Sequence, residues 1–184
     1  MPRSPRKSLP LDGARLEELA LAYVARYATT RAKLEAYLRR KLRERGWVGE
    51  GEPLVGGISG RFVEAGYLDD EAFARGRTDS LLRRGYGVRR VGQALAAAGI
   101  EEALREDLRP GEASQREAVL ALARKRGFGP FAPAPPDPQR REKQLAAMVR
   151  AGHSFEQARQ VVDAPDTDTA EQWAAELRGD DSCE

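Results

Sequence analysis

Apolar residues recur along most of the chain at spacings of three and four, the pattern of a helix that buries one face. The clearest runs are Leu34-x3-Leu38-x3-Leu42, Val91-x3-Leu95 and Leu145-x2-Met148. The pattern predicts helices over residues 12–28, 30–45, 58–65, 70–84, 88–98, 101–108, 112–126, 138–151 and 155–162. The β-branched residues that strands favour are scarce, with two Ile, ten Val and five Thr. We therefore expect an all-α fold.

Six glycines have the spacing of a Schellman helix end, in which glycine takes a positive φ just past the helix and the next residue packs back on the last turn. They are Gly46, Gly66, Gly85, Gly99, Gly127 and Gly152. Three of them, Gly46, Gly99 and Gly152, lie 53 residues apart, and a similar helical segment precedes each. A fixed internal period of this size predicts tandem supersecondary units.

We interpret the chain as an elongated tandem array of three three-helix repeats, which should stack because each buries little core alone. The expected parts are a flexible N-terminus (1–11), a first repeat (12–66) with a Gly-rich insertion (49–57), a second repeat (67–109), a third repeat (110–162) with a Pro-rich insertion (129–138), and an acidic tail (163–184). The tail has one amphipathic patch around Trp173 and Leu177 and is expected to be loosely held or disordered at its end. Asp69 is expected to cap the helix that follows it, with Leu68 and Phe73 as a hydrophobic staple. A divalent metal site at Asp69-Asp70-Glu71 is the less favoured alternative.

Few residues are suited to catalysis. The chain has one histidine and one cysteine, Cys183, which excludes an intrachain disulfide and a multi-histidine metal site and favours a reducing cytoplasm. No apolar run is long enough for a membrane span, no secretory signal is evident, and no Gly-x4-Gly-Lys-Ser/Thr phosphate loop occurs. We expect no enzyme activity and no cofactor. His153, Trp47 and Tyr67 are expected to be packed, structural side chains.

Charge is distributed unevenly. Residues 1–150 carry 29 basic and 20 acidic side chains, a net +9, whereas residues 151–184 carry two and nine, a net −7. A basic body attracts polyanions, so nucleic acid, or a protein coated on it, is the expected partner class. Three basic groups stand out, although each could simply solvate a helix: Lys33, Arg39, Arg40 and Arg43 on the outer side of one helix; Arg83, Arg84, Arg89 and Arg90 around Gly85-Tyr86-Gly87; and Arg124-Lys125-Arg126, which we expect to compensate a helix dipole.

Two segments resemble the RecX family of regulatory proteins. They are Gly66-Tyr67-Leu68-Asp69-Asp70-x2-Phe73-Ala74 and Arg84-Gly85-Tyr86-Gly87-x-Arg89-Arg90-Val91-x3-Leu95-x3-Gly99-Ile100. The segment that opens with Ala22-Tyr23-Val24-Ala25-Arg26-Tyr27 also resembles the first unit of that family. The resemblance as a whole covers about residues 15–162 and is strongest over 58–105. The insertions at 49–57 and 130–138 and the tail after 163 depart from the family pattern.

The resemblance implies three tandem three-helix repeats and a non-enzymatic regulator of the RecA recombinase. Such a protein binds the RecA filament on single-stranded DNA and inhibits filament growth, ATP hydrolysis and strand exchange, and direct DNA contact and a monomeric state are further expectations. The expected partner-binding residues are Arg39, Arg40, Lys41, Arg43, Arg83, Arg84, Arg89 and Arg90. An autonomous DNA- or RNA-binding module and a helical scaffold for another protein remain as alternatives.

Overall fold

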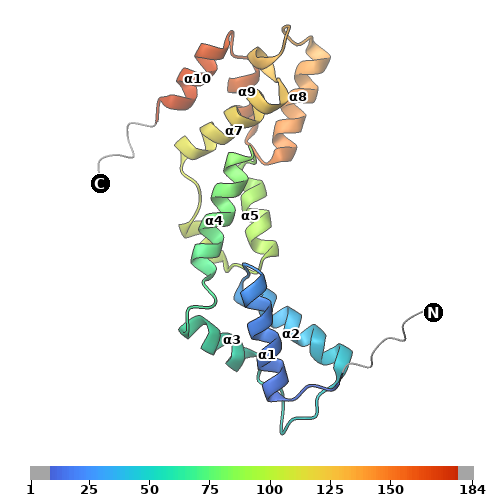
Figure 1. Ribbon diagram of the computed structural model, residues 1–184. Helices are drawn as coiled ribbons and strands as arrows, with labels where there is room; N and C mark the ends of the chain where they lie inside the picture. Colours follow the sequence, from blue (N-terminus) through green and yellow to red (C-terminus); the bar gives the residue numbers. More distant parts are fainter. Residues whose placement is uncertain (1–8, 178–184) are drawn as a thin grey trace, which may run out of the picture. The chain divides into compact units, whose positions relative to one another are not determined.

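The computed structural model describes residues 9–177, and that part is helical with no β-strand (Figure 1). An isolated bridge pairs Leu11 with Trp47. The elements are α1 (Gly13–Arg26), α2 (Arg31–Arg45), α3 (Val55–Glu64), α4 (Asp70–Arg83), α5 (Val88–Ala97), α6 (Glu102–Asp107), α7 (Glu112–Arg126), the 3-10 helix η1 (Gly129–Phe131), α8 (Pro138–Ala151), α9 (Phe155–Val162) and α10 (Thr167–Ala175). The all-α prediction is confirmed. Each of the nine predicted helices is present, with the largest shift at α3, which begins at Val55.

The chain forms two compact units. The first unit contains residues up to Phe73 together with Ala98–Ile100, and the second contains Ala74–Ala97 and the chain from Glu101 onward. The boundaries of three tandem repeats, and their elongated stacking, stay predictions.

The core of the first unit lies between α1, α2 and α3. Leu16 of α1, Leu34 and Leu38 of α2 and Phe62 of α3 are buried there. Leu11 is fully buried as well. Its backbone is fixed beside Trp47, because its N–H donates to the Gly46 carbonyl (3.0 Å) and its carbonyl accepts from the Val48 N–H (2.9 Å). The expectation of a flexible segment as far as residue 11 is therefore wrong at Leu11, while residues 1–8 lie outside the described range.

Two adjacent aspartates of the first unit cap two different helices. Asp69 accepts from the Ala72 N–H at the start of α4 (2.8 Å), which confirms the predicted cap. Asp70 accepts from the Arg31 N–H at the start of α2 (2.9 Å), beside Thr30, whose hydroxyl donates to the Ala98 carbonyl (2.6 Å). Helix capping thus accounts for both carboxylates, and within residues 9–177 no group of three or more His, Cys, Asp or Glu side chains could hold a metal ion.

The core of the second unit is built from α7, α8 and α9, which pack on one another in Figure 1. Val119, Met148 and Val161 are fully buried there. His153 is 4 % exposed, and its Nε2–H donates to the Gly85 carbonyl (3.0 Å). Burial lowers the pKa of the imidazole, and its Nδ1 has no hydrogen-bond partner in the described chain. The prediction of a packed, structural histidine is confirmed.

The acidic tail is not loosely held over its first part. Asp166 caps α10 by accepting from the Thr169 N–H (2.7 Å), and α10 packs on α7 through Ala170 and Ala174. The Arg116 guanidinium lies 4.7 Å from the centre of the Trp173 ring and donates to the Trp173 carbonyl (3.0 Å). The helix contains Trp173 of the predicted amphipathic patch, and the end of the tail, with Cys183, lies outside the described residues.

All six predicted helix-ending glycines have a positive φ, between 62° and 103°. At Gly85, for example, the Tyr86 N–H donates to Leu81 (3.0 Å) and the Gly85 N–H to Leu82 (2.8 Å), the paired bonds of a Schellman end. Trp47 packs against the first core as predicted, whereas Tyr67 does not. Tyr67 is 58 % exposed, and its ring contacts the Phe62 ring edge-on, with centroids 5.5 Å apart.

Candidate functional site

The basic residues predicted on α2 all lie away from the buried Leu34 and Leu38, but acidic neighbours neutralise most of them. Arg39 pairs with Glu35 (2.8 Å). Lys41 and Arg40 share Glu44, at 2.6 Å and 3.6 Å. Arg43 is exposed and forms no ion pair within the described chain. The excess positive charge of α2 is therefore smaller than its sequence suggests.

The two carboxylates of α2 stay ionised at neutral pH. Burial raises the pKa of Glu35, but hydrogen bonds from Ser59, Arg31 and Arg39 outweigh it and hold that pKa below its usual range. The hydrogen bond from Lys41 is the main reason why the pKa of Glu44 is lowered. Both groups remain available to compete with an incoming anion for the same cations.

The arginines around Gly85-Tyr86-Gly87, here called the glycine-loop arginines (Arg83, Arg84, Arg89 and Arg90), surround a tightly packed turn in the second unit. A Cβ at Gly85 would lie 2.9 Å from the Leu122 Cα, and one at Gly87 would collide with the Gly152 backbone. The Gly87 N–H donates to the Ala151 carbonyl (3.0 Å). The turn is thus wedged against α7 and the end of α8, which fixes where the four side chains start.

The glycine-loop arginines differ in their contacts. Arg89 donates to the Val149 carbonyl near the end of α8 (2.5 Å), so it holds the turn in place. The Arg84 guanidinium lies over the Tyr86 ring, 5.4 Å from its centre. Arg83, Arg84 and Arg90 are exposed and form no ion pair among residues 9–177. The structure therefore leaves three of these cations exposed and without an ion pair, although Asp79 and Glu117 line the same surface pocket as Arg83, and it gives the fourth a structural contact.

The third basic group, Arg124-Lys125-Arg126, ends α7 as predicted. Arg124 pairs with Glu171 of α10 (2.5 Å) and lies over the Phe131 ring, 5.8 Å from its centre. These contacts, together with the position in the last turn, agree with the expected structural role.

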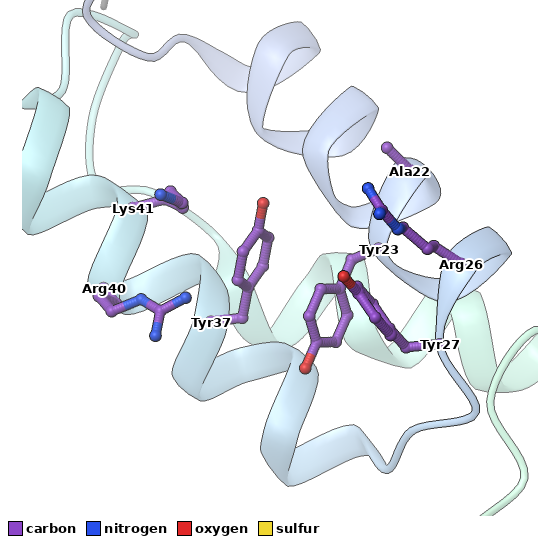
Figure 2. A pocket seen from close by; sticks show the side chains of 7 residues that line it. All are labelled: Ala22, Tyr23, Arg26, Tyr27, Tyr37, Arg40 and Lys41. Carbon is purple, nitrogen blue, oxygen red and sulfur yellow. The ribbon is translucent and has the colours of Figure 1, made fainter. Parts of the chain in front are cut away.

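A groove between α1 and α2 was not found from the sequence. It has a volume of about 480 Å³ and is lined by Ala22, Tyr23, Arg26, Tyr27, Tyr37, Arg40 and Lys41 (Figure 2). We call it the tyrosine groove. The available signal was the i,i+4 pair Tyr23 and Tyr27 beside Arg26, because such a pair shares one helix face. Arg40 and Lys41 are thus predicted partner-binding residues that line this groove.

In the described part of the chain, no helix combines the length and the apolar character that crossing a bilayer requires.

Comparisons with known proteins agree with the resemblance. The family model for the second three-helix domain of RecX matches residues 69–108. The regulatory protein RecX of Myxococcus xanthus is 34 % identical over 172 residues, covering 89 % of this chain and 90 % of that protein. RecX of Thermus thermophilus is 38 % identical over 107 residues, covering 58 % of this chain and 71 % of that protein.

A solved structure shares the fold. The crystal structure of RecX from Lactobacillus salivarius superposes with a TM-score of 0.65 at 18 % identity, covering 89 % of this chain and 97 % of that one. The match to the Myxococcus protein extends over most of both chains, so it supports membership of the family and not only a shared fold. Both the Myxococcus and the Thermus proteins are named as regulatory proteins. The chain therefore belongs to the RecX family of regulatory proteins.

Proposed function

We propose that this chain binds RecA filaments on single-stranded DNA and inhibits filament growth, ATP hydrolysis and strand exchange, and so modulates recombination and DNA repair. It would act as a cytoplasmic monomer without chemistry of its own. Membership of the RecX family supports the regulatory role, and the second three-helix repeat, which we place at 67–109, overlaps the residues that the family model matches.

The exposed arginines Arg83, Arg84 and Arg90 are the single observation that carries the proposal. Like charges near one turn repel each other, and none of these three arginines forms an ion pair within residues 9–177. Guanidinium groups bind phosphates and carboxylates bidentately, so an anionic surface would remove the repulsion and gain hydrogen bonds. A nucleoprotein filament offers both kinds of anion at regular intervals.

The inhibition would be steric and electrostatic. A filament repeats its contact sites, so several weak contacts to one chain add up through a high effective concentration. A bound chain that touches more than one protomer would obstruct the addition of subunits and the entry of duplex DNA.

The test measures RecA ATP hydrolysis on single-stranded DNA against increasing amounts of this protein. We expect inhibition at or below equimolar ratios. The triple variant Arg83→Gln, Arg84→Gln, Arg90→Gln should need at least about tenfold more protein for half-inhibition, since the loss of three charged contacts exceeds about 1.4 kcal/mol. Arg89 is left intact because it binds the Val149 carbonyl.

A matched control removes the same charge elsewhere in the second unit. Lys125→Gln, Arg140→Gln, Arg150→Gln changes three exposed side chains outside the candidate site and should inhibit like the parent protein. Both triple variants should retain the helical circular dichroism signal. Equal losses in the two variants would refute a role for the glycine-loop arginines, and a parent protein without effect on hydrolysis would refute the proposed function itself.

A further inference from the structure

The tyrosine groove has an aromatic wall built from two helices. The rings of Tyr23 on α1 and Tyr37 on α2 are stacked, with centroids 4.3 Å apart and planes 18° apart. Tyr27 continues the wall at 5.3 Å from Tyr23, tilted by 51°. Figure 2 shows the three rings gathered between the helices, and Tyr27 is 50 % exposed. The groove thus presents a preformed aromatic surface with one ring open to solvent.

Cations surround this wall. Arg26 lies 5.6 Å from the centre of the Tyr27 ring, and Arg40 and Lys41 lie 5.6 Å and 5.8 Å from that of Tyr37. No acidic side chain lines the groove, although Glu44 beside it pairs with both cations of α2. One carboxylate shared by two cations leaves an excess of positive charge. The groove therefore suits a ligand that is anionic and has flat rings.

Single-stranded nucleic acid has both properties. Unpaired bases stack on aromatic side chains whatever their sequence, and phosphates bind Arg and Lys. A duplex hides its base faces, and an acidic peptide would use the cations but leave the tyrosine rings without a matching surface. A volume of about 480 Å³ lies within the range of small-ligand sites, so it accommodates one or two nucleotides of a longer strand.

We propose that the tyrosine groove binds single-stranded nucleic acid directly, with a base stacked on the exposed Tyr27 ring and phosphates held by Arg26, Arg40 and Lys41. This contact goes beyond the proposed inhibition of RecA, since it needs no recombinase. The two proposals can fail separately, because one is measured on bare oligonucleotide and the other as ATP hydrolysis.

The first test is fluorescence anisotropy of a labelled oligothymidylate of about twelve nucleotides with the full chain at low salt. Tyr27→Ala should weaken binding at least about fivefold, the lower end of the effect of losing one stacked base. The matched control is Tyr67→Ala, which removes a similarly exposed tyrosine of the same unit outside the groove and should change binding little. Equal effects of the two substitutions, or no binding by the parent, would overturn the proposal.

A second variant tests the phosphate contacts while leaving all three tyrosine rings in place. Arg26→Gln should reduce the slope of log affinity against log salt by about 0.7, the value for one phosphate contact on a single strand. The control Arg61→Gln removes a cation of α3 that pairs with Glu17 (3.0 Å), and it should leave the slope unchanged. Equal slopes for Arg26→Gln and the parent would exclude Arg26 as a phosphate ligand and contradict the assignment.

Photocrosslinking gives a direct readout. An oligonucleotide carrying 5-iodouracil should crosslink to Tyr27, identified by mass spectrometry of the digested full chain, and unlabelled oligothymidylate should compete. Crosslinks confined to other residues would overturn the proposed site. Competition by a polyglutamate peptide at the same charge concentration, as strong as that by oligothymidylate, would show a general anion site and refute base stacking.

Discussion

Gly99 combines a left-handed backbone with a close approach, and a substitution there should be costly for two separable reasons. Its φ is +77°, and a Cβ built on it would overlap the Cβ of Ala32, the second residue of α2. A non-glycine residue in the left-handed region costs about 1–2 kcal/mol, and an extra methyl in a packed contact costs about 1–3 kcal/mol. Gly99→Ala should therefore lower the free energy of unfolding by about 2–5 kcal/mol, a large part of the ~5–15 kcal/mol of a typical domain.

The two costs can be separated with a second substitution. Ala32→Gly removes the methyl that the new Cβ would meet, at its own cost of up to about 1 kcal/mol for glycine in a helix. In the Ala32→Gly background, Gly99→Ala should cost only the backbone term, about 1–2 kcal/mol. The difference between the two backgrounds, about 1–3 kcal/mol, measures the steric contact.

Urea denaturation is the assay. Each unit contains one tryptophan, Trp47 in the first and Trp173 in the second, so fluorescence in a Trp173→Phe background reports on the unit that holds Gly99 and Ala32. The urea midpoint should fall for Gly99→Ala, and the same substitution should lower it by less in the Ala32→Gly background than in the parent. An identical loss in both backgrounds would refute the steric contact and leave only the backbone term.

Two further predictions concern the second unit. Because burial lowers the pKa of His153 below its usual value near 6.5, the unfolded chain binds more protons than the folded chain as the pH falls through that value, so stability decreases with falling pH. Urea denaturation of the second unit between pH 7.5 and 5.5 should show this decrease for the parent. Since the chain has one histidine, His153→Leu should give a flatter dependence of stability on pH, and the same dependence in both proteins would contradict the prediction. Trp173→Ala should lower the free energy of unfolding by about 2–3 kcal/mol, somewhat less than a fully buried aromatic residue, because it removes the surface that Arg116 covers; a loss below about 0.5 kcal/mol would show that α10 adds nothing to the core.

Local patterns predicted the helices and their ends because the responsible forces act over a few residues. The spacing of Leu34, Leu38 and Leu42 encodes a buried stripe, and glycine is needed wherever φ is positive, as at Gly85 and Gly152.

Features that depend on distant partners were missed. Leu11 is buried because it pairs with the backbone on both sides of Trp47, and α10 packs because Arg116, 57 residues away, meets Trp173. Alanines make up the buried face of α10, so its hydrophobic pattern is weak.

The sequence indicated which arginines belong to the candidate site but not which contacts each of them makes in the fold. The arginines around Gly85 are together in sequence, yet Arg89 differs from its neighbours through a carbonyl 60 residues away. The tyrosine groove arises only when α1 and α2 lie side by side, so that Tyr23 meets Tyr37, and neither helix alone indicates it.

The meeting of Gly87 with Gly152 has a consequence for how the second unit tolerates change. Two main chains touch there without any intervening side chain, and the Arg89 N–H donates to the Gly152 carbonyl (3.2 Å). No side-chain rotamer can change to widen or narrow that spacing, so the backbone contact fixes the distance between the start of α5 and the end of α8. Substitutions of the surrounding residues change only side chains near this contact, whereas a Cβ at either glycine would push the two backbones apart.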